Sequence, residues 1–144
     1  MQIKEFMTPN VEFIHTTDNL KYAAEKMQEL NIGIVPVFED SMAAGVLTDR
    51  DIVVRAIAQG WDPIKTRVSA VMTKEIVSCL EDAELKEAAK VMEEKDVHRL
   101  LVKNSEGRYV GILSLGDVAV RADKDIAEEI LADVSKPYSH SMSC

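Results

Sequence analysis

An internal repeat limits what this chain can fold into more than any other feature of its sequence. The stretch GVLTDRDIVVRA at 45–56 is matched by GILSLGDVAVRA at 111–122. Upstream of these stretches, Met7–Thr8 recurs at Met72–Thr73. Further identical pairs are Leu20 with Leu85, Ala23–Ala24 with Ala88–Ala89, Met27 with Met92, and Val37 with Val102. Agreement in register over so long a stretch indicates two copies of one supersecondary unit.

Each copy has the same order of predicted elements. A short apolar run predicts a first strand, and helical spacing of apolar residues follows it. Thr17–Asp18 in one copy and Asp82 in the other precede this spacing, as N-cap residues precede helices. A second strand is followed by a third, which runs into the matched stretch, and a helix begins at the Asp of that stretch. The strands so predicted cover 11–14 and 32–38 in one copy, and 75–80 and 98–102 in the other.

The sequence therefore predicts an α/β (α+β) fold in which the order β-α-β-β-α occurs twice. A copy of about 60 residues buries too little surface by itself, so we expect the two copies to pack sheet against sheet about a pseudo-twofold axis. Such packing would create two equivalent clefts between the copies. The predicted division is 1–58 for the first copy, 59–67 for a connector, 68–123 for the second copy, and 124–144 for a C-terminal helix and tail.

Composition excludes several classes of function. The chain has 144 residues, of which 47% are hydrophobic and 29% charged, as in soluble globular proteins. It has no apolar run long enough to span a membrane and no signal peptide, so we expect a cytoplasmic protein without a membrane partner. The net charge of −8 disfavours nucleic-acid binding, which depends on phosphate neutralisation. Cys79 and Cys144 are interpreted as free thiols.

No catalytic or metal-binding motif is present. The sequence lacks GxSxG, a Walker loop and a triad, and its histidines and cysteines lack metal-ligand spacing. We therefore predict neither an enzyme nor a metal protein, and no required cofactor. Three basic residues flank the Asp positions of the matched stretches and are interpreted mainly as solvated helix charges that could also touch phosphate. They are Arg50, Arg55 and Arg121.

The matched stretches carry the chemistry of a nucleoside site. The carboxylates of Asp51 and Asp117 can accept hydrogen bonds from both hydroxyls of a ribose. Thr48 and Ser114, three residues earlier, can meet the sugar or donate to a phosphate. The glycines that open the matched stretches, Gly45 and Gly111, would let the backbone pass close to a neighbouring segment. The alternative interpretation is that these hydroxyl and carboxyl groups cap the following helices, and the two roles can coexist.

These residues resemble the CBS (cystathionine-β-synthase) domain family in its tandem form, the Bateman module. FMTPN and VMTKE open the copies, NIGIVPVFED and DVHRLLVKN mark the second strand, and GVLTDRD and GILSLGD mark the third. The resemblance covers about 1–123, and the remaining residues are similar to those of small stand-alone bacterial members of the hypoxic-response type. It implies a homodimer that binds an adenine nucleotide (AMP, ADP, ATP or a related adenosyl ligand) and regulates an unknown effector protein.

The resemblance also implies which residues line each cleft. In the family, the ribose carboxylate of one copy is complemented by the early strands of the other copy. The cleft of Thr48 and Asp51 would be closed by Ile76, Val77, Val97, His98 and Arg99. The cleft of Ser114 and Asp117, together with Ile112, would be closed by Asn10, Val11, Ile32, Gly33 and Ile34.

The two predicted clefts differ in charge. VHRLLV resembles the phosphate-contacting strands of nucleotide-sensing members. By this resemblance, Arg99 of this chain would bind phosphate through its planar guanidinium, and His98 would provide a further donor. The matching Gly33 and Ile34 cannot do this. We therefore expect the Asp51 cleft to hold phosphate better than the Asp117 cleft.

Two other functions remain open from the sequence. The chain could be a constitutive dimeric interaction module with ligand-free clefts, in which the matched residues serve only as caps. It could also be a thiol-redox-sensitive regulator that uses Cys79 and Cys144. The ligand, the number of occupied clefts, the orientation of the dimer and the effector are not determined by the sequence.

Overall fold

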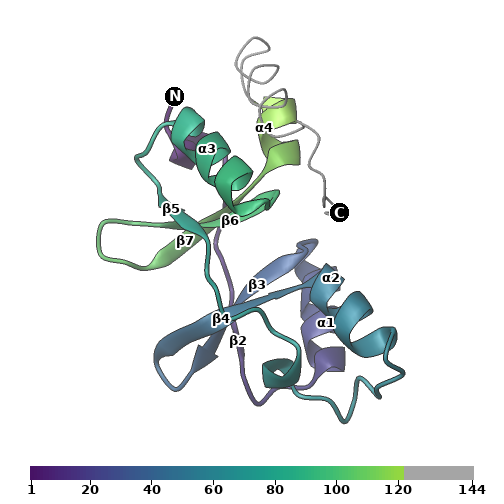
Figure 1. Ribbon diagram of the computed structural model, residues 1–144. Coiled ribbons are helices and arrows are strands. Elements are labelled where there is room, and N and C mark those ends of the chain that lie inside the picture. Colours follow the sequence, from purple (N-terminus) through teal and green to yellow (C-terminus); the bar gives the residue numbers. More distant parts are fainter. Residues whose placement is uncertain (122–144) are drawn as a thin grey trace. The chain divides into compact units, whose positions relative to one another are not determined.

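The computed structural model describes residues 1–121, and these form two compact units. We call Glu12–Ile76 the early unit, and Met1–Val11 together with the chain from Val77 onward the late unit. Figure 1 labels the α-helices and most of the strands. The predicted C-terminal helix and tail at 124–144 lie outside the described residues.

The early unit contains the first copy of the repeat. In chain order it consists of β2 (Ile14–His15), α1 (Leu20–Leu30), β3 (Ile34–Glu39), β4 (Met42–Thr48), α2 (Asp49–Asp51), the π-helix η2 (Ile52–Ile57) and the 3₁₀ turn η3 (Val68–Ala70). β3 pairs in parallel with β2 and antiparallel with β4. The predicted order β-α-β-β-α is therefore confirmed here.

The late unit contains the second copy. It consists of the 3₁₀ turn η1 (Ile3–Glu5), β1 (Thr8–Pro9), β5 (Ser78–Leu80), α3 (Leu85–Lys95), β6 (Arg99–Lys103), β7 (Tyr109–Ser114) and α4 (Leu115–Arg121). Its sheet has the strand order β1-β7-β6-β5, in which only β5 and β6 are parallel. The same β-α-β-β-α order recurs, which confirms the predicted mixed α and β fold.

Each unit is completed by the segment that opens the other copy. In the late unit, Thr8 in β1 pairs with Ile112 in β7. In the early unit, Val46 and Thr73 exchange two backbone hydrogen bonds, both of 2.8 Å. The division of the chain into units therefore differs from the division into repeats, because Met1–Val11 lies with the second copy.

The predicted close approach of the glycines to a neighbouring segment is confirmed. A Cβ atom on Gly45 would collide with the carbonyl oxygen of Thr73, and a Cβ atom on Gly111 would collide with the Met7 side chain. Glycine is needed at both positions because the opening segments cross the sheet edge there.

The N-cap residue of the first helix lies one residue after the predicted cap in the first copy and two residues after it in the second. Asn19 caps α1, with its Oδ1 accepting the Tyr22 N–H at 2.8 Å. The predicted cap Asp18 instead accepts the His15 N–H, also at 2.8 Å. Glu84, rather than Asp82, occupies the cap position of α3 and makes no side-chain cap bond. Both predicted caps are therefore wrong, and in the first copy the reason is that Asp18 closes the turn that precedes the helix.

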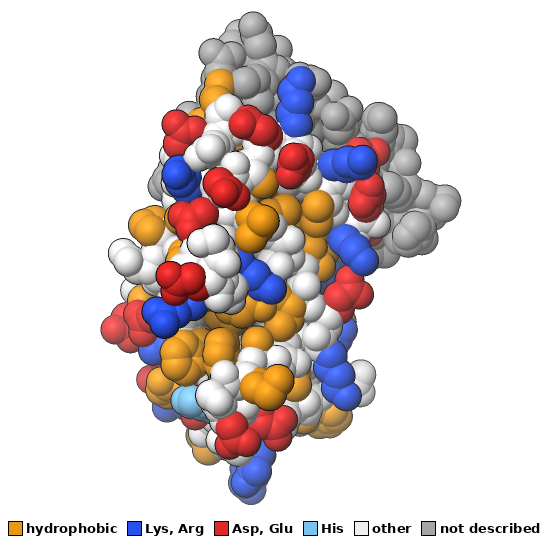
Figure 2. Space-filling view, turned by 90° about the vertical axis from the view of Figure 1, so that its left-hand side faces the viewer, with side chains coloured by type: hydrophobic (Ala, Val, Ile, Leu, Met, Phe, Trp, Pro, Cys, Tyr) orange, Lys and Arg blue, Asp and Glu red, His pale blue; other side chains and the backbone are white. Residues whose placement is uncertain are grey.

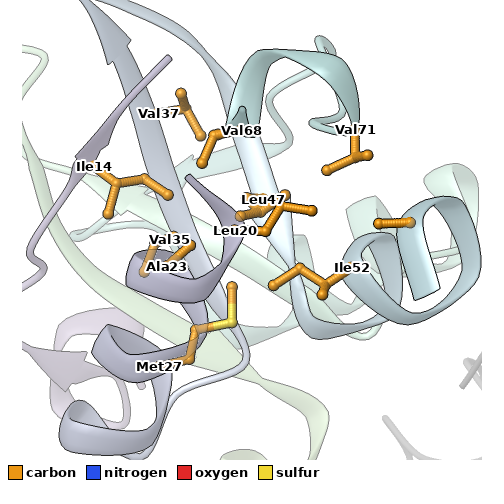
Figure 3. Packing of buried hydrophobic residues seen from close by; sticks show 11 residues of the cluster. Ile14, Leu20, Ala23, Met27, Val35, Val37, Leu47, Ile52, Val68 and Val71 are labelled. Carbon is orange, nitrogen blue, oxygen red and sulfur yellow. The ribbon is translucent and has the colours of Figure 1, made fainter. Parts of the chain in front are cut away.

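Each unit has its own hydrophobic core, formed where helices cover one face of its sheet. In the early unit, Leu20 and Met27 of α1 pack with Val35, Val37 and Leu47 of the sheet (Figure 3). In the late unit the core members from helices and strands are Leu85, Ala88, Ala89, Met92, Leu100, Val102, Leu113 and Val118. The cores hold the start of the helix after β4 and after β7 at fixed places on the sheets.

Candidate functional site

The candidate site begins with two matching turns, each joining the last strand of a unit to the following helix. In the early turn, Thr48 Oγ1 accepts the Asp51 N–H and Asp51 Oδ2 accepts the Thr48 N–H, both at 3.0 Å. This reciprocal pair is a capping box, which satisfies backbone donors that a helix start leaves unpaired.

The late turn repeats this arrangement. Ser114 Oγ accepts the Asp117 N–H at 3.0 Å, and Asp117 Oδ2 accepts the Ser114 N–H at 3.3 Å. The helices begin at Asp49 and Leu115, so each predicted ribose carboxylate lies in the first helical turn. The prediction that each helix begins at its Asp is therefore wrong by two residues, whereas the predicted capping role is confirmed.

The surroundings of Asp51 hold its carboxylate from several sides. Thr73 Oγ1 lies 3.2 Å from both Oδ1 and Oδ2, and Arg55 Nε lies 3.8 Å from Oδ1. Only 7% of Asp51 is exposed. A buried carboxylate needs such partners because removing it from water is otherwise costly. Asp51 thus joins the early turn to the segment that opens the second copy.

The surroundings of Asp117 are different. Its residue is partly exposed rather than buried. Thr8 corresponds to Thr73 in the repeat, yet within residues 1–121 no hydrogen bond joins Thr8 to Asp117. Within the same part of the chain, the Ser114 N–H is the one hydrogen-bond donor to the Asp117 carboxylate. Much of the acceptor capacity of Asp117 is therefore available.

The strands beside the two turns also differ. Ile34 of β3 lies opposite Thr48, and the Asp49 N–H donates to the Gly33 carbonyl oxygen at 3.0 Å. In the late unit, Arg99 of β6 occupies the position opposite Ser114. The Leu115 N–H donates to the His98 carbonyl oxygen at 2.9 Å. Directly opposite residues of an antiparallel pair share one face of the sheet, so a cation accompanies the late turn and an aliphatic side chain the early turn.

The remaining predicted site residues lie on strands or on the segments that enter them. Asn10 has a left-handed backbone with a φ of 63°. Ile112 is buried in β7, and the Leu101 N–H donates to the Val77 carbonyl oxygen at 3.1 Å. The predicted lining residues of the early unit are Ile32, Gly33, Ile34 and Ile76, and those of the late unit are Asn10, Val11, Val77, Val97, His98, Arg99 and Ile112. Closure of each cleft by both units stays a prediction.

Two side chains at the early turn have roles that the sequence did not reveal. Arg55 was interpreted as a solvated charge, but its Nη1 donates to the carbonyl oxygens of Val71 and Met72 at 3.0 and 3.2 Å. From the sequence, we predict no role in the site for Thr73. The recurrence of Met-Thr at the start of each copy was the signal that could have identified Thr73.

Other chemistry is sparse among the described residues. Residues 1–121 contain no group of three or more His, Cys, Asp or Glu side chains placed to hold a metal ion. No helix in this range is long and apolar enough to cross a membrane. Burial, and then the negative charge of Glu87, raise the pKa of the Cys79 thiol. On the face shown in Figure 2, acidic and basic side chains alternate, so neither sign forms a single broad patch there.

Comparison with known proteins identifies the architecture. The CBS domain model matches residues 3–57 and 68–124. CBS domain-containing protein YhcV of Bacillus subtilis is 35% identical over 96% of this chain and 98% of its own length. Hypoxic response protein 1 of Mycobacterium tuberculosis is 35% identical over 94% of this chain and 95% of its own.

Solved structures have the same fold. The crystal structure of CBSX2 in complex with AMP is 27% identical and has a TM-score of 0.67, covering 87% of this chain and 97% of that one. The structure of hypoxic response protein 1 with two coordinated zinc ions is 31% identical and has a TM-score of 0.71, covering 85% of this chain and all of the other, 100%.

Proposed function

This chain belongs to the CBS domain family, and on that premise we propose that it is a regulatory sensor of an adenosine nucleotide. The observation that carries the proposal is the matched pair of Ser/Thr–Asp turns, which present Asp51 and Asp117 at equivalent places in the two units. The relative CBSX2, which holds AMP, supports an adenosyl ligand.

The chemistry of the proposed ligand site follows from the turns and their strands. A ribose carries neighbouring hydroxyls, which a carboxylate can bind with two oxygens. A phosphate favours a guanidinium, whose planar fork binds two oxygens at once. Arg99, opposite Ser114, provides such a group on a strand start. Together these groups favour a ribose phosphate over a neutral nucleoside.

Regulation requires that the ligand bind one conformation better than another. We propose that the ligand acts on a partner protein through such a difference, and that the chain self-associates.

Exposed apolar side chains on and after η2 support self-association, because a helix surface of this kind is normally covered. They are Val53, Val54, Ile57, Trp61 and Ile64. Sedimentation velocity with and without nucleotide tests the proposed self-association, and a monomer at all concentrations contradicts it.

Titration calorimetry tests the ligand class. Adenosine, AMP, ADP, ATP and S-adenosylmethionine form the panel, with GMP as the control for the base. We expect at least one adenosyl compound to bind with a dissociation constant below about 1 mM. The double variant Asp51→Ala/Asp117→Ala should abolish binding, whereas Asp82→Asn, an exposed carboxylate outside both turns, should retain it. Absence of binding by the whole panel contradicts the proposal.

A further inference from the structure

The two carboxylates of the proposed site are not equivalent. We infer that Thr73 closes Asp51 to ligand, and that the late turn with Asp117 is the ribose-binding site, so the chain takes one nucleotide. This inference rests on the proposed function, because it assigns that function to one turn. It reverses the expectation from sequence that the Asp51 cleft is the stronger one.

The first argument is the occupation of the Asp51 oxygens. Oδ2 accepts the Thr48 N–H and the Thr73 hydroxyl, and Oδ1 lies near the same hydroxyl and the Arg55 guanidinium. A ribose would bring two hydroxyl donors to a carboxylate that already has three partners and is 7% exposed. Binding there would first require removal of Thr73, which costs a hydrogen bond before any is gained.

The second argument is that Thr73 cannot easily move away. Its N–H and carbonyl oxygen both bond to Val46 at 2.8 Å. Just before it, the carbonyl oxygens of Val71 and Met72 accept bonds from Arg55 Nη1 at 3.0 and 3.2 Å. The backbone around Thr73 is thus fixed to β4 and to the helix that follows it. These bonds keep the Thr73 backbone beside Asp51, so a ligand could displace the hydroxyl only by turning it about χ1, which is restricted in a β-branched side chain.

The third argument is the state of the late turn. Thr8 is fixed to β7 through pairing with Ile112, as Thr73 is fixed to β4, yet in the described chain Thr8 donates nothing to Asp117. Asp117 is partly exposed, and its bond from the Ser114 N–H, at 3.3 Å, leaves most acceptor positions open. Arg99 lies opposite Ser114, so the same turn has a cation nearby. A nucleoside monophosphate therefore finds more complementary groups here.

Calorimetry with AMP on the full chain tests the assignment. We expect about one AMP per chain, with Asp117→Asn weakening AMP by at least about tenfold. Asp51→Asn, by the inference, weakens AMP several times less than Asp117→Asn does. Circular dichroism of both variants establishes that each is folded. Two equivalent sites, or loss of AMP in Asp51→Asn but not in Asp117→Asn, would overturn the inference.

A ligand-free measurement separates this inference from the proposed function. Thr73→Val removes the hydroxyl that occupies Asp51, and Thr8→Val is its matched control. We expect Thr73→Val to lower the melting temperature clearly and Thr8→Val to lower it little. Equal shifts would overturn the closure of Asp51 by Thr73 even if AMP binds. Absence of binding by the whole adenosyl panel together with unequal shifts would overturn the proposed function and the assigned ribose site, and would leave Asp51 as a structural carboxylate.

Discussion

The early and late turns share a hydrogen-bonded box but differ in what surrounds its carboxylate. Asp51 is buried against Thr73 and Arg55, whereas Asp117 is partly exposed. The box is made by residues three apart in sequence, so the repeat reproduces it. The hydroxyl of Thr73 comes from a segment distant in sequence, and there the two units diverge. Two turns with the same local hydrogen bonds can therefore differ in how accessible their carboxylates are to a ligand.

The largest expected effect tests whether the two cores are as alike as the repeat suggests. Leu47 and Leu113 are equivalent in the repeat, and each is completely buried, with 0% exposed. Leu47→Ala and Leu113→Ala should each cost about 3–4 kcal/mol in the free energy of unfolding, through lost burial and the cavity left behind. Urea denaturation measures both. A loss in one variant several times that in the other would break the equivalence.

Replacing the matched glycines with alanine should destabilise the two units by different amounts. Gly45→Ala meets the backbone carbonyl of Thr73, which is fixed by two hydrogen bonds, and should cost about 2–3 kcal/mol. Gly111→Ala meets mainly the flexible Met7 side chain and should cost about 1 kcal/mol. Denaturation curves for the pair provide the comparison. The argument fails if Gly111→Ala is the more damaging change.

Removing the cap oxygen should reduce stability by the same amount in the two units. Thr48→Ala and Ser114→Ala each remove the oxygen that accepts the N–H of the Asp three residues later. We expect each variant to lose about 1 kcal/mol of stability, the usual value for a helix cap. Thermal unfolding of the two variants, with Ser105→Ala in an exposed loop as a control, checks this expectation. A marked difference would show that the two boxes are unequal themselves.

The smallest effect concerns the position where the repeat places Ile14 and Cys79. Ile14 is completely buried, whereas Cys79 is half-buried with its pKa raised by burial and by Glu87. Because the thiolate is the reactive form, a raised pKa keeps Cys79 protonated at neutral pH. In a Cys144→Ser background, iodoacetamide should label Cys79 more slowly than it labels the urea-unfolded chain, at pH 7 and at pH 8. Equal rates would revive the redox hypothesis.

Much of the fold was readable from the sequence. The repeat and its apolar periodicity predicted the order of elements, because helix and strand faces are set by spacing along the chain. The cap positions were less accurate, since Asp18 and Asn19 are both good capping residues and only the backbone decides between them. The sequence carries no pattern that predicts the π-helical course of η2.

The candidate site was readable only in part. Thr48, Asp51, Ser114 and Asp117 were predicted as site residues from the matched stretches, and their mutual hydrogen bonds fit the predicted caps. The role of Thr73 could not be inferred by inspecting either stretch, because Thr73 lies 22 positions from Asp51 in the chain. The structural role of Arg55 was missed for the same reason.

The sequence by itself determined that this chain has two copies of one unit, each ending in a Ser/Thr–Asp turn. Those properties depend on neighbours a few residues apart, and the order of residues fixes them. Only the tertiary structure decided that Met1–Val11 completes the late unit and that Thr73 covers Asp51. Such contacts join distant segments, and their geometry depends on how the whole unit packs.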